Sequence, residues 1–224
     1  LWMNKFNINI LNKRLQTLTD KVVRYGHDHQ IQTLKIALLG DFASGLINVS
    51  NRVMQEEDVI TQIQIASEKI AEMSAYFSGK FENVEIYSVT DNHSRLSPNK
   101  KDSIDKENFC RLIPWYLQAR LQNISNIKIV ENEYYGHDFC MIDMFGEKIL
   151  GVHGHRDSLN NIISNLYLMF KDTSIKYILC GHYHKNYENT EHDITVIVNE
   201  SLSGVDEYAK DIRRTGRPGQ KFII

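Results

Sequence analysis

Polar side chains that can bind metal ions directly follow four short apolar runs of this sequence. The runs IALL and EIYSVT lead into Gly40–Asp41 and Asp91–His93, and the runs KILGV and KYILC lead into His153–His155 and Gly181–His184. A mixture of imidazole, carboxylate and amide groups suits borderline divalent ions such as Mn²⁺, Fe²⁺ or Zn²⁺. The pattern therefore indicates a divalent metal site, provided that the four runs bring their ends to one place.

Each piece alone is also typical of ordinary structure. A Gly-Asp pair after a strand often forms a turn, and a histidine in a strand is often a hydrogen-bonded core residue. The ordered set of four favours the metal site. Within that site Asp41 could bridge two ions, because a carboxylate has two oxygens. Two ions about 3.5–4 Å apart can activate a water and hold the attacking and leaving oxygens of a phosphoryl group.

The elements that must position these residues can be read from the hydrophobic pattern. Apolar residues at three- and four-residue steps predict four helices, of which the first ends near Gly26. The apolar runs read as buried strands, and a hairpin turn is expected at residues 145–147. The helices are expected at residues 8–26, 58–80, 105–121 and 158–170. This order predicts an α/β sandwich with one site at the carboxyl ends of its strands.

Composition sets the broad class of the protein. The chain has 224 residues, of which 42% are hydrophobic, and we expect one domain over residues 1–224. Three cysteines without metal-like spacing read as buried reduced thiols, which predicts a cytoplasmic protein. No apolar run approaches the roughly 20 residues of a membrane span. We therefore expect no contact with a membrane.

The charge distribution is uneven although the net charge is only −2. The stretches SRLSPNKKDSIDK and AKDIRRTGRPGQK are rich in lysine and arginine. They are either solvated surface loops or contacts for a polyanion such as nucleic acid. The acidic net charge gives no overall field for nucleic acid.

The ordered blocks resemble those of the calcineurin-like metallophosphoesterases. GDFAS is similar to their G-D-x-x-D block, and DNHS is similar to G-N-H-D/E. HGH and GHYH match the last two blocks, so the resemblance spans about residues 35–185. It implies a sandwich of two mixed β-sheets flanked by helices. The residues around these blocks further resemble a phage-type branch of the family, which is similar to SbcD-like DNA exonucleases.

The resemblance also implies a role for each matching residue. Asp41 would bridge two divalent ions, which are expected to be Mn²⁺, with Fe²⁺, Zn²⁺ or Ni²⁺ as other candidates. Asn92, His153 and His182 would complete one ion site, and His184 would belong to the other. His93 would not bind metal; it would act as general acid or stabilise charge on the leaving oxygen.

Two residues beside these blocks are candidate substrate contacts. Arg95 directly follows the third block and could hold a phosphate oxygen, or form a surface ion pair. His155 is the second histidine of HGH and could face the substrate, support a ligand, or lie on the surface. Both assignments come from position alone.

The sequence departs from the family pattern in informative ways. The first block, Asp-x-His, is not found, and we expect it upstream of Leu1 on a missing first strand. Ser44 and Ser94 stand where many relatives have an acid, so His93 would lack a carboxylate partner. Asp91 replaces a glycine and adds negative charge near the metals.

The reaction expected is hydrolysis of a phosphoester by a hydroxide that two metal ions activate. A phosphodiesterase or nuclease fits best, with DNA as a possible substrate. The alternatives are a phosphomonoesterase for a small nucleotide, or a catalytically impaired metal-binding scaffold. A nucleic-acid-binding subunit of a larger complex is a third, and a homodimer or a partner subunit is compatible with each.

Overall fold

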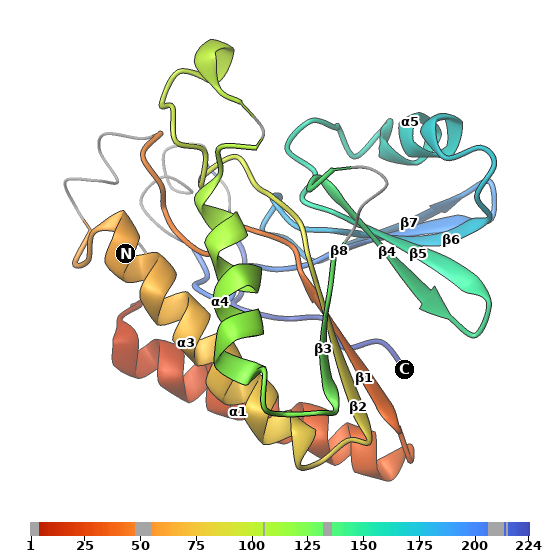
Figure 1. Cartoon of the computed structure of the whole chain (residues 1–224). Coiled ribbons are helices and arrows are strands. Elements are labelled where there is room, and N and C mark those ends of the chain that lie inside the picture. The colour runs from red at the N-terminus through yellow and green to blue at the C-terminus, as the bar shows by residue number, and fades with distance from the viewer. Residues whose placement is uncertain (1–4, 48–54, 105, 132–135, 206–212, 214) are drawn as a thin grey trace.

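A computed structural model describes the chain except residues 1–4, 48–54, 105, 132–135, 206–212 and 214. Its described part forms two β-sheets with helices on both outer faces (Figure 1). The predicted α/β sandwich of two sheets flanked by helices is therefore confirmed. The helices are α1 (Ile8–Asp28), α3 (Val59–Ser78), α4 (Leu112–Leu121) and α5 (Ile162–Met169).

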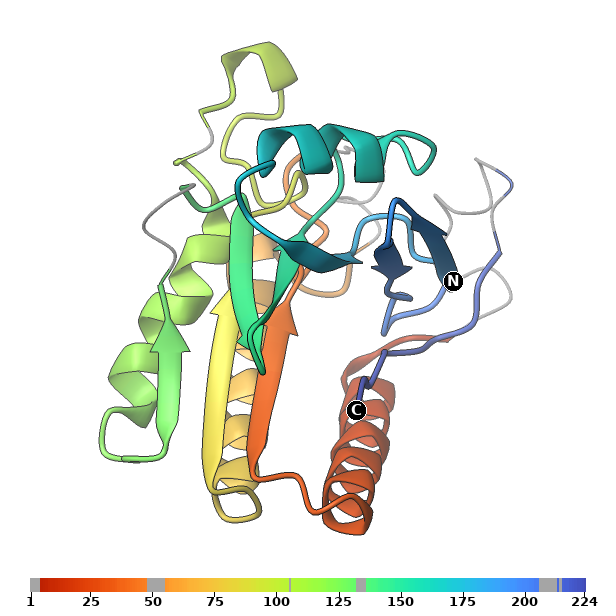
Figure 2. The same cartoon turned by 90° about the vertical axis from the view of Figure 1, so that its right-hand side faces the viewer.

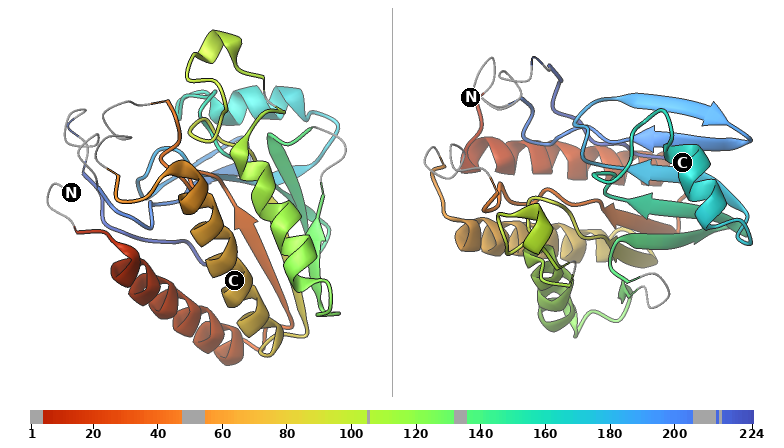
Figure 3. Two further views of the ribbon diagram at one scale, coloured as in Figure 1. Left: turned by 60° about the vertical axis from the view of Figure 1, so that its left-hand side comes forward. Right: turned by 90° about the horizontal axis from the view of Figure 1, so that it is seen from above.

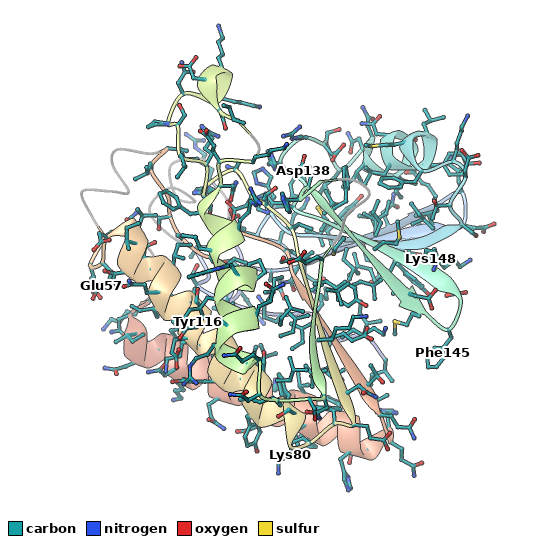
Figure 4. The ribbon with its side chains drawn as sticks, viewed as in Figure 1. Glu57, Lys80, Tyr116, Asp138, Phe145 and Lys148 are labelled. Carbon is teal, nitrogen blue, oxygen red and sulfur yellow. The ribbon has the colours of Figure 1, made fainter. Side chains whose placement is uncertain are left out.

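The first sheet is parallel and has the strand order β1-β2-β3. Its strands are β1 (Thr33–Leu38), β2 (Asn83–Ser88) and β3 (Ile127–Val130). Helices α1, α3 and α4 lie side by side over it (Figure 3). Asp58 begins α3 by accepting hydrogen bonds from the amides of Ile60 and Thr61, a common N-cap. Tyr116 of α4 donates its hydroxyl to Glu68 of α3, which ties these two helices together (Figure 4).

The second sheet is mixed and has the order β4-β5-β6-β8-β7. Its strands are β4 (Phe139–Met144), β5 (Glu147–Val152), β6 (Ile175–Cys180), β7 (Tyr187–Glu191) and β8 (Ile194–Val198). The predicted hairpin joins β4 to β5 through Phe145 and Gly146, which both have positive φ (56° and 89°). This is the backbone that two-residue hairpins favour. Phe145 and Lys148 mark the tip of that hairpin in Figure 4.

Three apolar clusters define the layers. One lies between the first sheet and helices α1, α3 and α4, and a second lies between the second sheet and α5. The third contains Tyr87 of β2 and Val89 just after it, together with Cys140, Ile142 and Ile149 of the second sheet, so it lies between the sheets. The molecule is thus a sandwich of helices, sheet, sheet and helix.

Three local predictions need correction. Helix α4 begins at Leu112 rather than near residue 105, because a 3₁₀ turn capped by Asn108 precedes it. Helix α1 continues to Asp28, past the expected stop at Gly26. A Cβ at Gly26 would lie 2.4 Å from Cε1 of Phe81, so this glycine permits close packing instead of ending the helix. Strand β7 was not predicted at all.

The remaining broad expectations concern cysteines, membranes and the basic tail. Cys110, Cys140 and Cys180 are buried free thiols, as predicted. In the described residues, no helix is long and apolar enough to cross a membrane. Of the basic tail, Arg213 and Arg217 are exposed, whereas Lys210 and Arg214 lie outside the described residues.

The end of the chain packs back onto the molecule. The C-terminal end of the chain lies beside α1 in Figure 2. The rings of Phe222 and of Tyr25 in α1 lie 5.9 Å apart, centroid to centroid. The Lys221 amide donates to the side-chain oxygen of Asn199 just beyond β8, and its Nζ donates to Asn186. The C-terminal segment therefore connects the first helix to the loop that follows β6.

Candidate metal centre

Four strand ends meet where the two sheets come together, as the sequence predicts. Strands β1 and β2 point towards this edge in Figure 2, and they deliver Asp41 and Asn92. Strands β5 and β6 deliver His153 and His182. One potential ligand atom from each of Asp41, His153 and His182 lies within 4.8 Å of the others.

The imidazole of His153 is the centre of the cluster. It is 1% exposed, and its Nε2 lies 2.9 Å from Oδ1 of Asn92 and 3.4 Å from Oδ1 of Asp41. Ligand atoms about 2.1 Å from a common ion lie roughly 3 to 3.5 Å apart from one another. Nε2 of His153 therefore lies at the spacing of a neighbouring ligand from each of these two oxygens.

In the neutral form of its ring, the hydrogen bonds of His153 leave no proton for these contacts. Its Nδ1 lies 2.7 Å from the carbonyl oxygen of Leu39, which can only accept, so Nδ1 carries the proton of the neutral ring. The Nε2 lone pair then faces two oxygens, those of Asn92 and Asp41. Three lone pairs that converge on one point repel each other unless a cation or a proton lies between them.

Several polar atoms of the site are buried without a hydrogen-bond partner. Among the described residues, Oδ1 of Asp41, Nδ1 of His182 and Nδ1 of His155 make no hydrogen bond. A buried polar atom without a partner costs about 1–3 kcal/mol. Such atoms call for an explanation, and a bound ion or ligand provides one. The residues present thus fit a divalent ion held by Asp41, Asn92, His153 and His182.

The described residues supply few ligands for a second ion. Nε2 of His184 lies 3.0 Å from Oδ2 of Asp41, the oxygen on the other side of that carboxylate. The side chain of His184 is 47% exposed, against 15% for Asp41. Asp41 could therefore bridge two ions, but among the described residues no group of three histidine, cysteine or carboxylate ligands includes His184.

The loops that carry the ligands have unusual backbones. Asp41, His182 and His184 have φ values of 56°, 61° and 52°, in the left-handed region that non-glycine residues seldom adopt. The amide of Tyr183 donates to the carbonyl of Gly181, 2.6 Å away, which closes a tight turn around His182. Backbone strain of this kind concentrates at functional sites.

Electrostatics prepares the side chains as ligands. Burial alone would raise the pKa of Asp41, but His153 and the hydrogen bond with His184 outweigh it and lower this pKa. Burial, followed by the nearby His153, lowers the pKa of His182 to about 4. The carboxylate is therefore ionised and the imidazole is neutral at pH 7, the forms in which both bind metals.

His93 lies beside the cluster with one nitrogen fixed. Its Nδ1 lies 3.0 Å from the carbonyl oxygen of Ser44, so Nδ1 carries a proton and Nε2 is left for proton transfer. A carbonyl thus takes the place of the carboxylate partner that Ser94 does not provide. A Cβ at Gly45 would lie 1.7 Å from the His93 carbonyl oxygen, so this close approach requires glycine.

His155 also lies at the site. Its ring centroid is 5.4 Å from that of His153 and 6.3 Å from that of His182. Burial, then the nearby His153 and Arg156, lower its pKa to about 3. Nε of Arg156 donates to Nε2 of His155 over 3.4 Å, which puts the proton of the neutral ring on the buried Nδ1.

Arg95 is used by its own loop. Its Nε, Nη1 and Nη2 donate to the carbonyls of Ser97, Asn92 and Pro98. The guanidinium therefore shapes the loop after Asn92, and the structure gives it no ion pair with an acid among the described residues. Its expected phosphate contact is not tested by this arrangement.

Asp91 was noted in the sequence only as an extra negative charge, and its place in the structure is more specific. It is 3% exposed, and its Oδ2 accepts the backbone amide of Asp41 over 2.7 Å. Sequence reasoning missed this role. The signal was a carboxylate at a position where a glycine was expected.

Comparison with known proteins gives distant structural similarities. No protein-family model and no curated protein sequence matches this chain. An archaeal phosphodiesterase has 14% identity and a TM-score of 0.39, over 83% of this chain and 76% of its own. A predicted phosphoesterase from Streptococcus pneumoniae TIGR4 has 16% identity and a TM-score of 0.37, over 78% and 74%. Vps29 from Entamoeba histolytica, solved with Zn²⁺, has 14% identity and a TM-score of 0.35, over 78% and 79%.

Proposed function

We propose that this chain is a metal-dependent phosphoester hydrolase that prefers phosphodiesters. The observation that carries the proposal is the convergence of lone pairs from Asp41, Asn92 and His153 on one point, beside an unpartnered nitrogen of His182. Asp41, Asn92, His153 and His182 would hold one divalent ion, and Asp41 with His184 would contribute to a second. Mn²⁺ is the first ion to test, because the mixed nitrogen and oxygen donors suit it.

The bound metal would supply a polarised phosphoryl oxygen and an activated water. The chain's own residues do the rest of the work. His93 donates its Nδ1–H to the carbonyl of Ser44, so in the doubly protonated ring the proton on Nε2 is the one that can pass to the leaving oxygen. His155 presents a buried Nδ1–H that has no acceptor among the described residues. This N–H would donate to a non-bridging oxygen of the substrate.

The preference for a diester follows from the supply of positive charge. A phosphomonoester carries about −1.5 to −2 at neutral pH, whereas a diester carries one negative charge. All three nitrogens of the Arg95 guanidinium donate to backbone carbonyls. These bonds use three of the five N–H groups of Arg95 in holding its loop, which favours the smaller charge of a diester.

The test is hydrolysis of bis(p-nitrophenyl) phosphate and of p-nitrophenyl phosphate with added Mn²⁺. We expect turnover of the diester to exceed that of the monoester and to disappear in Asp41→Asn and after chelation. Faster turnover of the monoester would contradict the diester preference. DNA would be the next substrate, since the phage-type nuclease similarity and the exposed Arg213 and Arg217 are compatible with it.

A non-catalytic metal-binding scaffold is the second candidate. The observation that favours it is that, among the described residues, the one group of three histidine, cysteine or carboxylate ligands is Asp41, His153 and His182, and it does not include His184. A scaffold would bind one ion tightly and hydrolyse neither substrate with Mn²⁺, Fe²⁺ or Zn²⁺. The same assays, with metal content measured in parallel, separate the two functions.

A further inference from the structure

The carboxylate of Asp91 is buried and accepts four hydrogen bonds from the protein. Its Oδ2 accepts the Asp41 amide at 2.7 Å, the Ser94 hydroxyl at 3.1 Å and the Cys110 thiol at 2.6 Å. Its Oδ1 accepts the Ser94 amide at 2.6 Å. Because both oxygens are occupied by protein donors, Asp91 acts as an acceptor for the loops and not as a metal ligand in this structure.

The four donors come from three separate parts of the chain. The Asp41 amide belongs to the loop after β1, Ser94 belongs to the loop after β2, and Cys110 belongs to the turn before α4. In addition, the side chain of Asn108 donates to the Asp91 carbonyl at 2.7 Å. One carboxylate therefore joins the loop of Asp41 to the loop of Asn92 and His93. A buried charge is costly unless it is paired or fully hydrogen-bonded, and here the donors offset that cost.

The bond to Asp41 fixes the direction of a ligand. Asp41 has a φ of 56°, which is unfavourable for a residue with a side chain. Its amide points at Asp91, and its carboxylate points to the other side, towards His153 and His184. Gly40 makes room for this arrangement, because a Cβ there would lie 2.6 Å from Cβ of Asp91 and 2.8 Å from Nδ1 of His153.

We propose that Asp91 is a positioning residue that orients Asp41, and with it the loop of Asn92 and His93, for metal binding. The proposal rests on the metal-dependent function proposed above. Groups that orient metal ligands typically contribute 10- to 100-fold to metal affinity or activity. The charge that the sequence adds at position 91 thus acts through hydrogen bonds to the ligand loops.

The test compares Asp91→Leu with Thr90→Val. Leucine has a similar branched shape but accepts no hydrogen bond, so the amides of Asp41 and Ser94 both lose their acceptor. Thr90 is an equally buried neighbour whose hydroxyl bonds to Asp138 and not to a ligand loop. We expect Asp91→Leu to bind Mn²⁺ roughly 10-fold or more weakly, and its Co²⁺ absorption spectrum to shift. Thr90→Val should keep the wild-type affinity and spectrum.

A readout that needs no metal separates this inference from the proposed function. In the metal-free protein, the Asp41 amide proton should exchange slowly with solvent in wild type and in Thr90→Val, and quickly in folded Asp91→Leu, which offers that amide no acceptor. Slow exchange in folded Asp91→Leu, or unchanged metal affinity of this variant when wild type binds Mn²⁺, would overturn the positioning role. If wild type binds no metal although the exchange pattern is as expected, the orientation of Asp41 stands and the metal-dependent function fails.

Discussion

Hydrogen bonds to single backbone carbonyls determine which ring nitrogen of two site histidines carries a proton. The carbonyl oxygen of Leu39 accepts a hydrogen bond from Nδ1–H of His153, and that of Ser44 accepts one from Nδ1–H of His93. The first bond leaves Nε2 of His153 facing the oxygens of Asn92 and Asp41, and the second leaves Nε2 of His93 able to transfer a proton. Backbone carbonyls thus assign two histidines to different tasks.

Replacement of His93 tests its assigned task. We expect His93→Ala to lower kcat for the diester by roughly 100- to 10,000-fold, the usual contribution of a general acid. Its Mn²⁺ affinity should stay near that of wild type, since no ligand is lost. His27→Ala is the control, because the His27 side chain is 90% exposed in α1. A parallel loss of metal would mean that His93 is a ligand.

Replacement of His155 tests the unpartnered N–H. A hydrogen bond to a charged group contributes about 1.5–3 kcal/mol, so His155→Phe should lower kcat/KM by roughly 10- to 100-fold. His155→Asn should retain most of the activity, since its amide can donate from near the place of Nδ1. Equal losses in both variants would show that the ring packs the site instead of donating to substrate.

At the scale of elements, glycines decide how closely the ligand loops approach. Gly40 and Gly45 stand where a Cβ would meet Asp91 and His93. Such contacts cannot be read from one sequence, although the four strand ends and their polar residues can be. The apolar runs show where strands end, but the backbone of the loops beyond them depends on which strands become neighbours.

The missed strand illustrates the same limit. Strand β7 has the sequence YENTE, which lacks the apolar alternation of a strand with one buried face. It forms because β8 offers it an edge and because His192 and Asp193 both adopt positive φ, 53° and 62°, in the connecting turn. Its existence is therefore set by the neighbouring strand, and the buried strands were predictable because their own residues carry the signal.

Substitution of Gly40 tests the loop contact. Gly40 and Gly146 both need positive φ (95° and 89°), but nothing lies within 4 Å of a Cβ at Gly146. Gly146→Ala should therefore cost only the backbone term, about 1 kcal/mol. Gly40→Ala should lower the free energy of unfolding by at least about 1 kcal/mol more than Gly146→Ala does, and it should also weaken Mn²⁺ binding. Urea unfolding and metal titration measure both effects, and equal costs would contradict the contact with Asp91.

At the scale of the whole molecule, the polar groups of the site lower the free energy of unfolding. His182 and His155 are partly buried as neutral rings, and the carboxylate of Asp41 faces His153 at the junction of two sheets. Most of the fold was predictable, since the sandwich and its strand ends follow from hydrophobic patterns. The proton assignments and the role of Asp91 were not, because they depend on backbone atoms from distant parts of the chain.

This arrangement predicts how stability depends on pH. The pKa of His182 is lowered to about 4 and that of His155 to about 3, while an unfolded histidine titrates near 6.5. Between these values the unfolded chain binds protons that the folded protein does not, so the free energy of unfolding falls as pH falls from about 6.5 towards 4. Urea unfolding with a chelator at pH 7.5 and pH 5 measures this.

The control for that prediction is a pair of variants. His155→Gln should reduce the loss of stability between pH 7.5 and pH 5, because one group that titrates only when unfolded is removed. His27→Gln, at an exposed position, should leave the loss unchanged. Stability that does not change over this range in wild type would show that the site histidines are charged in the folded protein.

Calorimetric titration of the chelator-treated protein with Mn²⁺ tests the central claim, that Asp41, Asn92, His153 and His182 form a cation site. The account predicts saturable binding of at least one ion per chain to wild type. It also predicts binding at least roughly 10-fold weaker in both Asp41→Asn and Asn92→Leu, with His27→Ala unchanged. Binding to wild type that both substitutions leave intact, or no binding of Mn²⁺, Fe²⁺ or Zn²⁺ at all, would contradict it.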